Sequence, residues 1–208
     1  FSEQFFCGYF PYTWNSRNQL AAISGSATAS FQYDAFGRRA SKSVEGLSTS
    51  FLYDGADIVQ ELSGTTPTAN LLTGGLDEVF RRTDSSGASF YLTEALGSPI
   101  ALADAAAGIQ TAYTYEPFGK TTLTGDASSN AQQFTGREND GTGLYYYRAR
   151  YYDPSSQRFI SEDPLGFAGG DLNLYAYVGN DPVNAIDPSG KNPLLAVCLG
   201  GATYGLAA

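Results

Sequence analysis

Four aspartates in this sequence are each followed by proline, and they are its best candidates for acid-base chemistry: Asp153, Asp163, Asp181 and Asp187. Histidine is absent, which excludes Ser-His and Cys-His nucleophile pairs and leaves proton transfer near neutral pH to carboxylates. Two carboxylates that share one proton can carry out hydrolysis, because one activates water while the other donates to the scissile carbonyl. Asp-Pro also opens many type I turns, so each pair has a structural interpretation beside the chemical one.

Other kinds of site are poorly supported. The two cysteines, Cys7 and Cys198, lie near opposite ends of the chain, without the spacing of a zinc knuckle or a disulfide framework. The sequence also has no Gly-x-Gly-x-x-Gly motif after a predicted strand that would indicate a dinucleotide site. We therefore expect neither a metal nor a cofactor. The 12 basic and 21 acidic residues give a net charge of −9 without any basic run, which argues against nucleic acid as a partner.

The composition predicts an all-β fold. Glycine reaches 24 of 208 residues, and Tyr and Phe reach 15 and 13, a combination typical of short aromatic strands separated by tight turns. The length allows one or two domains with a sizeable core. The chain opens with Phe1 and lacks methionine, so we expect a processed piece or a fragment of a longer protein. Residues 1–30 show no secretory signal.

A recurring hexad indicates a repeat of about 20 residues. Tyr33-Asp34-Ala35-Phe36-Gly37-Arg38 returns 82 residues later as Tyr115-Glu116-Pro117-Phe118-Gly119-Lys120, and Tyr53-Asp54-Gly55 is a shorter copy 20 residues after the first. We expect each copy to end a strand at the tyrosine, turn through the acid and the glycine, and resume with the basic residue. Tyrosines at equivalent positions would then stack as a ladder on one face of a long sheet.

The remaining segments extend this pattern. Strand-like stretches at 49–53, 71–80 and 89–92 are bounded by clusters of Gly, Asp and Ser typical of hairpin turns. Residues 93–108 favour a loop or a strand pair over a helix. We expect 121–131 to form a polar surface loop, and the apolar stretch 193–208 is shorter than a membrane span. A β-propeller is the alternative fold, but a period near 20 fits stacked hairpins better than blades of about 40 to 50 residues.

From Phe134 onward the chain carries several long motifs in close succession. They are Phe134-Thr135-Gly136-Arg137, Gly143-Leu144-Tyr145-Tyr146-Tyr147-Arg148-Ala149-Arg150-Tyr151-Tyr152-Asp153-Pro154, Arg158-Phe159-Ile160-Ser161-Glu162-Asp163-Pro164-Leu165-Gly166, Asn173-Leu174-Tyr175-Ala176-Tyr177-Val178-Gly179-Asn180-Asp181-Pro182 and Asp187-Pro188-Ser189-Gly190. In this order they resemble the RHS repeat-associated core domain of rearrangement-hotspot (RHS) proteins and the C component of insecticidal toxin complexes. The Tyr-Asp copies upstream resemble the YD repeats of the same proteins.

The resemblance implies a spiralling ribbon of antiparallel β-hairpins, the YD-repeat shell, closed by the RHS-associated core domain. It also implies a cavity that holds a C-terminal polypeptide, commonly a toxin, and aspartyl-type autoproteolysis that frees this polypeptide after an Asp-Pro-x-Gly-Leu motif. Matched motif by motif, Asp163 and Asp187 become the catalytic pair. Arg150 becomes the arginine that holds a carboxylate or a developing oxyanion, and Lys191-Asn192 becomes the cleavage site.

One position departs from the family motif. Lys191 stands where the motif ends in leucine, which puts a cation where an apolar side chain would dock. The self-cleaving core therefore competes with a structural cage or cell-surface interaction module that has no catalytic activity. A third hypothesis, a carbohydrate or adhesion module that uses exposed tyrosines and Trp14, competes with the interpretation that these rings are core. Asp153 and Asp181 are interpreted as turn residues and Glu162 as a solvated neighbour.

We expect three segments: YD-repeat β-hairpins over 1–90, the core domain over 91–191, and over 192–208 the start of a variable C-terminal segment too short for a toxin domain. The expected partners are a C-terminal toxin or variable segment in cis, upstream repeats of the same shell, and secretion or delivery proteins. The parent protein would be secreted or at the cell surface. An open ribbon leaves unpaired strand edges, so we expect the chain by itself to associate or to be partly unstable.

Overall fold

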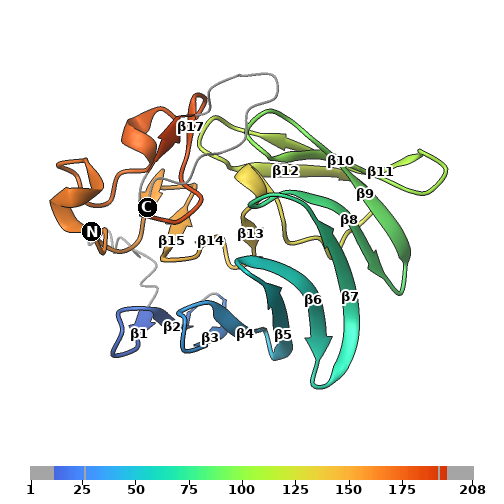
Figure 1. The fold of residues 1–208 in the computed structure, drawn as a ribbon, viewed down its shortest axis with the longest axis horizontal. Helices are drawn as coiled ribbons and strands as arrows, with labels where there is room; N and C mark the ends of the chain where they lie inside the picture. The colour runs from blue at the N-terminus through green and yellow to red at the C-terminus, as the bar shows by residue number, and fades with distance from the viewer. Residues whose placement is uncertain (1–11, 26, 192, 196–208) are drawn as a thin grey trace, which may run out of the picture.

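One antiparallel sheet of twelve strands forms the first part of the chain in this computed structural model, which describes residues 12–25, 27–191 and 193–195. Each strand pairs with the strand before it in sequence, so the sheet is a continuous ribbon of hairpins (Figure 1). Its strands are β1 (Tyr12–Trp14), β2 (Leu20–Ile23), β3 (Ala29–Tyr33), β4 (Arg39–Val44), β5 (Leu47–Asp54), β6 (Asp57–Ser63), β7 (Thr66–Thr73), β8 (Val79–Asp84), β9 (Gly87–Thr93), β10 (Pro99–Ala103), β11 (Ile109–Tyr115) and β12 (Thr121–Gly125).

The all-β prediction is confirmed. The described residues form no α-helix, and none of their helical turns is long and apolar enough to cross a membrane. A single sheet of twelve strands excludes the propeller alternative, which needs separate blades. Asn192, Cys7 and Cys198 lie outside the described residues.

The repeat of about 20 residues is built into the ends of alternate strands. Tyr33, Tyr53, Thr73 and Thr93 lie 20 residues apart, each at the last or next-to-last position of β3, β5, β7 or β9. In an antiparallel pair the end of one strand lies beside the start of its neighbour. The hydroxyl of each repeat tyrosine therefore donates to the carbonyl of the first residue of the preceding strand: Tyr33 to Leu20 at 2.7 Å, Tyr53 to Arg39 at 2.9 Å and Tyr115 to Pro99 at 2.6 Å.

The hexad turns as its residues predict. Asp34 Oδ1 accepts hydrogen bonds from the backbone amides of Phe36 and Arg38, each at 2.9 Å. Gly37 adopts a φ of +85°, and Gly119 takes the same φ in the second copy. Because that region of φ is costly for residues with a Cβ, glycine is favoured at both positions, although Asn18 and Ala107 also take a positive φ in similar turns.

Three expectations were wrong. The tyrosines do not form a continuous ladder, because threonine occupies the equivalent positions at Thr73 and Thr93, and the tyrosines act through their hydroxyl groups instead. Residues 71–80 are two strands rather than one, since the chain reverses through Gly74 and Gly75, and the Gly74 amide bonds to the Glu78 carbonyl at 2.9 Å. Residues 121–125 are not a loop. They form β12, whose threonine-rich sequence suits an exposed edge strand.

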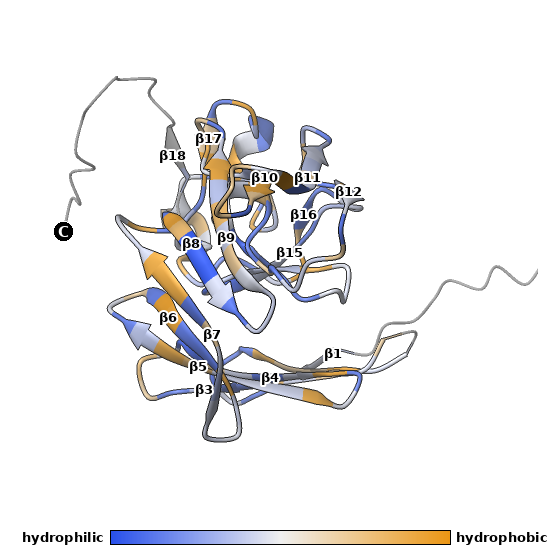
Figure 2. Ribbon diagram, turned by 90° about the vertical axis from the view of Figure 1, so that its right-hand side faces the viewer, coloured by the Kyte–Doolittle hydropathy of each residue, from blue (hydrophilic) through white to orange (hydrophobic). Residues whose placement is uncertain are grey.

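The second part of the chain forms small sheets and turns inside the curve of the ribbon. Figure 2 shows the ribbon bending beneath and beside this second part, which we call the core unit (residues 131–191 and 193–195). Its elements are β13 (Glu138–Asn139), β14 (Tyr145–Tyr147), β15 (Arg150–Asp153) and β16 (Arg158–Phe159) in one sheet, β17 (Ala185–Ile186) and β18 (Leu194–Leu195) in another, and the 3-10 turns η1 (Phe134–Gly136), η2 (Gly166–Gly169) and η3 (Val178–Asn180).

Aromatic rings dominate two of the three hydrophobic clusters, and the third lies within the ribbon around Phe51 and Leu71. The first core lies within the core unit and includes Phe134, Tyr145, Tyr147, Tyr152, Phe159 and Tyr177, all buried. The second joins the ribbon to the core unit, since ribbon residues such as Phe31 pack there against Tyr146 and Tyr151, with Trp14 packed against its edge. Burial of these rings supplies much of the free energy that holds the ribbon on the core unit. They are core residues rather than an exposed binding surface.

A buried ionic cluster also joins the two parts. Arg39 of β4 is fully buried and forms ion pairs with Glu138 and Asp140 of the core unit. Lys42 Nζ lies 2.8 Å from Asp140 Oδ1, and the Arg39 guanidinium lies 4.3 Å from the ring centroid of Tyr146.

The twelve strands run without a break across the position where we divided the chain. Residues 90 and 91 lie within β9. As a boundary between units of a parent protein, this division stays a prediction.

Candidate functional site

Arg150 holds both predicted aspartates. Its Nη2 atom lies 2.9 Å from Asp163 Oδ2 and 3.4 Å from Asp187 Oδ2. The three side chains come from different places: Arg150 from β15, Asp163 from the turn before η2, and Asp187 from the segment after β17. The tertiary structure thus brings together the three residues that the resemblance selected.

Asp163 has both of the roles that its sequence allowed. Its Oδ1 atom accepts the Leu165 amide at 2.8 Å, and its carbonyl accepts the Gly166 amide at 2.8 Å, as in a turn opened by Asp-Pro. Its Oδ2 atom is left to face Arg150. The turn therefore orients the carboxylate towards the site.

Asp187 is almost completely buried, with 2% of its surface exposed. Its Oδ1 atom accepts hydrogen bonds from the Ser189 hydroxyl at 3.2 Å and from the Lys191 amide at 3.1 Å. Its Oδ2 atom faces Arg150. Oδ1 is therefore bonded by residues of the predicted cleavage motif, and Oδ2 by Arg150.

The arginine is held as firmly as the carboxylates. Its Nε atom donates to the carbonyl of Gly190 and its Nη1 to the carbonyl of Leu174 at 3.1 Å, while its guanidinium lies 3.6 Å from the ring centroid of Phe159. Burial lowers the pKa of Arg150, and Asp163 and Asp187 oppose that shift. The Arg150 guanidinium therefore lies between two carboxyl groups, each within 3.4 Å of the same nitrogen atom.

The residues before the predicted cleavage site enclose a small cavity with these groups. The cavity has a volume of about 180 Å³ and is lined by Arg150, Asp163, Asp187, Lys191 and Gly169, among others. A Cβ atom placed on Gly169 would lie 2.8 Å from Asp163 Oδ2 and 3.3 Å from the carbonyl oxygen of Lys191. The Lys191 carbonyl and the Asp163 carboxylate therefore face the same space, which is large enough for a water molecule.

Gly190 is fixed by its surroundings. It has a φ of +69°, and a Cβ there would collide with the carbonyl oxygen of Tyr147. Glycine at this position of the Asp187 motif lets the chain pass close to β14 on its way to Lys191.

The other acidic candidates occupy turns or the surface. Asp153 Oδ1 accepts the Ser155 amide at 2.8 Å, and Asp181 Oδ1 accepts the side-chain amide of Asn184 at 2.8 Å. Glu162 is exposed. These are the roles that the sequence predicted for them.

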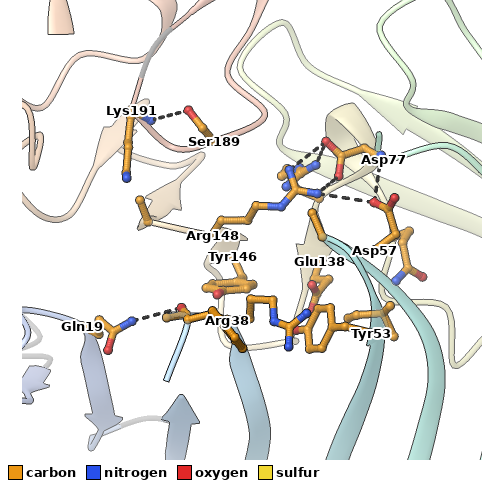
Figure 3. A pocket seen from close by; sticks show the side chains of 18 of the residues that line it. Gln19, Arg38, Tyr53, Asp57, Asp77, Glu138, Tyr146, Arg148, Ser189 and Lys191 are labelled. Carbon is orange, nitrogen blue, oxygen red and sulfur yellow. Dashed lines mark hydrogen bonds and ion pairs between the residues drawn. The ribbon is translucent and has the colours of Figure 1, made fainter. Parts of the chain in front are cut away.

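Two arginines beside the site were missed by sequence reasoning. Arg137 and Arg148 both donate to the carbonyl of Pro188, next to Asp187. They border a second cavity of about 430 Å³ between the ribbon and the core unit, shown in Figure 3. Both lie in the quoted motifs, but nothing in the sequence placed them near Pro188, because the contact spans 40 residues or more.

Comparison with known proteins agrees with this architecture. A family model described as "Teneurin YD-shell" matches residues 8–183. The chain belongs to the teneurin YD-shell family. The resemblance to RHS and YD-repeat proteins is therefore confirmed, and the twelve-strand ribbon is part of a YD shell.

Relatives of this YD-shell chain are long proteins of which it covers a small part. The tRNA3(Ser)-specific nuclease WapA of Bacillus spizizenii is 33% identical over 95% of this chain and 9% of its own length. The probable deoxyribonuclease RhsA of Dickeya dadantii is 30% identical over 91% of this chain and 14% of its own length. Toxin subunit YenC1 of Yersinia entomophaga is 29% identical over 87% of this chain and 22% of its own length.

Solved structures show the same YD-shell fold. The crystal structure of TcdB2-TccC3-Cdc42 matches with a TM-score of 0.72 and 26% identity, over 88% of this chain and 10% of that chain. The Tc holotoxin pore of Photorhabdus luminescens matches with a TM-score of 0.71 and 25% identity, over 92% of this chain and 10% of that chain.

Proposed function

We propose that this chain closes a YD shell around a C-terminal polypeptide and frees that polypeptide by cutting its own backbone after Lys191. The observation that carries the proposal is the contact of Arg150 with both Asp163 and Asp187 beside the residues of the cleavage motif. The relatives are named as a tRNA nuclease, a probable deoxyribonuclease and a toxin subunit. Proteins with such different names share this section, so we infer that the enclosed polypeptide varies and the shell does not.

The two aspartates would divide the acid and base roles. Asp187 Oδ1 accepts two hydrogen bonds, which favour its ionised form, so Asp187 is the base that removes a proton from the attacking water. Asp163 shares the cavity with the Lys191 carbonyl oxygen, so it is the acid that protonates this oxygen. Arg150 neutralises charge that builds up on the pair.

The products follow from the balance of atoms. The water oxygen bonds to the carbonyl carbon of Lys191 and gives its proton to Asp187. In the same step Asp163 protonates the carbonyl oxygen of Lys191, which gives a tetrahedral centre with two hydroxyl groups. As the C–N bond breaks, one hydroxyl group returns its proton to Asp163, and the departing nitrogen of Asn192 takes the proton held by Asp187. One peptide bond and one water become a carboxyl group on Lys191 and an amino group on Asn192.

The test is intact mass spectrometry of the 208-residue chain. We expect a product that ends at Lys191, and its loss in Asp163→Asn and in Asp187→Asn. Asp153→Asn is the matched control, because Asp153 occupies a similar Asp-Pro turn in which its carboxylate accepts the Ser155 amide, whereas Arg150 pairs with Asp163 and Asp187. An uncut wild-type chain, or a cut Asp163→Asn chain, refutes the proposal.

The second candidate function is a cage without catalytic activity. Lys191 in place of the family's leucine favours it. The substitution Lys191→Leu separates the two functions. If only the Lys191→Leu chain is cut, the catalytic residues of this chain are intact and the lysine at position 191 alone prevents self-cleavage.

The parent protein's setting is part of the same proposal. Upstream repeats would pair with the edge strand β1, and the toxin or variable segment would follow Lys191 in cis. Secretion or delivery proteins would carry the parent shell out of the cell or to its surface, as expected of a shell that releases a toxin.

A further inference from the structure

The carbonyl oxygen of Pro188 is held by two arginines at once. Arg148 Nη1 donates to it, and Arg137 Nη1 donates to it over 3.2 Å. Pro188 directly follows Asp187 and precedes Lys191 by three residues. Hydrogen bonds from charged donors are stronger than neutral ones, so these two contacts fix the backbone on one side of Asp187, while Arg150 fixes Gly190 on the other.

Both arginines are held in turn by one carboxylate of the ribbon, Asp77, in the turn between β7 and β8. Arg148 bonds to it twice, from Nη2 to Oδ1 at 2.6 Å and from Nη1 to Oδ2 at 3.2 Å, and Arg137 Nη2 forms an ion pair with Oδ2. Figure 3 shows Arg148 extending along the cavity towards Asp77 and Asp57. A continuous series of contacts therefore joins the shell wall to the cleavage motif.

The arrangement depends on the charge of Asp77. Arg137 is buried, with 4% of its surface exposed, and burial together with the nearby Arg148 lowers its pKa. Two guanidinium groups that converge on one carbonyl repel each other in a poorly solvated site. Asp77 offsets that repulsion, while Asp57 lies further from Arg148, at 3.5 Å.

The loop that carries Arg137 also packs closely against the β7–β8 turn of the ribbon. Gly136 has a φ of +70°, and a Cβ there would lie 2.9 Å from the carbonyl oxygen of Asp77. The adjacent Thr135 amide donates to Ser98 Oγ, in the ribbon, at 2.9 Å. The contact around Asp77 therefore forms only when the ribbon lies against the core unit.

We propose that Asp77 is a positioning residue for self-cleavage: it holds Arg137 and Arg148 on the Pro188 carbonyl and so places Asp187 in the cleavage site. The inference rests on the proposed self-cleavage and adds a regulation to it. The site is complete only after the β7–β8 turn has packed against the core unit. A chain in which the ribbon has not yet packed there therefore keeps its C-terminal polypeptide attached.

The first test compares the cleavage rates of Asp77→Asn and Glu61→Gln by intact mass spectrometry of the 208-residue chain. Glu61 is the matched control because it forms a buried ion pair with Arg82 inside the ribbon, at 2.8 Å. We expect Asp77→Asn to slow cleavage about tenfold or more, as small displacements of catalytic groups do, and Asp77→Glu to recover part of the rate. Glu61→Gln should cleave at the wild-type rate at temperatures where circular dichroism shows every variant folded. Equal rates for Asp77→Asn and wild type overturn the inference.

The second test does not depend on cleavage. In an Asp163→Asn chain, hydrogen exchange measured by NMR reports the Lys191 amide, which bonds to Asp187 Oδ1. We expect added Asp77→Asn to speed exchange at Lys191 and to leave the paired amides of β5 and β6 unchanged. Unchanged exchange at Lys191 overturns the inference.

If exchange responds but the wild-type chain is never cut, the proposed function fails and the positioning role stands. If the wild type is cut and Asp77→Asn is cut equally fast, the positioning role of Asp77 fails and the proposed function stands.

Discussion

The backbone amide of Lys191 donates a hydrogen bond to Asp187 Oδ1 over 3.1 Å. This contact uses the main chain, so any residue except proline at position 191 can make it. The Lys191 side chain is exposed and lies in the larger cavity (Figure 3), where its ammonium group remains solvated. A lysine where the family motif has leucine is therefore compatible with the main-chain contacts of the proposed cleavage site.

Replacing Lys191 by leucine should change the cleavage rate by no more than about threefold, because main-chain contacts carry the positioning. Time courses of cleavage followed by intact mass would measure the rates of the two chains side by side, with Lys191→Ala as a control for loss of side-chain contacts. A wild-type chain that stays intact while Lys191→Leu is cut would instead favour the inactive cage.

Gly169→Ala should block cleavage without unfolding the protein. The added methyl group would lie 2.8 Å from Asp163 Oδ2 and 3.3 Å from the Lys191 carbonyl oxygen, so it would occupy the space where the two must meet. Gly170→Ala is the matched control in the same turn. Gly170 has open space around it but a φ of +92°, so alanine there should cost about 1 kcal/mol of stability and leave cleavage intact. Cleavage rates and urea unfolding of both variants would check this, and wild-type cleavage by Gly169→Ala would contradict it.

Removing the hydroxyl of a repeat tyrosine should loosen the ribbon. Tyr53→Phe and Tyr115→Phe each lose one hydrogen bond to a strand-end carbonyl, which should lower the free energy of unfolding by about 1 kcal/mol. Tyr33→Phe loses the bond to the Leu20 carbonyl and also the contact with the Tyr151 hydroxyl, so its loss should be at least as large. Tyr175→Phe is the control, since the Tyr175 hydroxyl bonds to Glu162 in an exposed position, and its loss should change stability little. Urea unfolding at neutral pH measures the differences, and equal stabilities for all four variants would show that the strand-end bonds contribute nothing.

The buried cluster around Asp140 should make stability fall in acid. Burial opposes the charge of Asp140, but Arg39 and Lys42 overcome that effect and lower its pKa below 3.8. Because the pKa is lower in the folded protein than in the unfolded chain, the stabilisation is present above pH 3.8 and is lost as the pH falls through the folded pKa. Asp140→Asn should therefore cost about 3 kcal/mol at neutral pH, and this cost should shrink as the pH falls below 3.8 and through the folded pKa. A series of urea unfolding curves from neutral pH downwards, with the exposed Asp126→Asn as control, measures it. A cost independent of pH would show that the Asp140 charge is not what stabilises the cluster.

Local features of the fold could be predicted because their causes lie within a few residues. The Tyr33 hexad specified its own turn, since Asp34 bonds to amides two and four residues ahead and Gly37 supplies the positive φ. The prediction of a continuous ladder of stacked tyrosines was wrong because Thr73 and Thr93 occupy two of its positions. The strand at 121–125 was missed because a threonine-rich segment becomes a strand only when β11 is beside it.

The sequence by itself determined the all-β class, the repeat near 20 residues and, through its motifs, Arg150, Asp163 and Asp187 as candidates, because composition, turn chemistry and motif order are properties of the linear chain. Only the tertiary structure decided that one arginine nitrogen lies within 3.4 Å of both carboxylates, and that Asp77 of the ribbon holds the arginines on Pro188. Those contacts join residues tens of positions apart, and their distances are fixed by how the ribbon curves around the core unit, which no local pattern encodes.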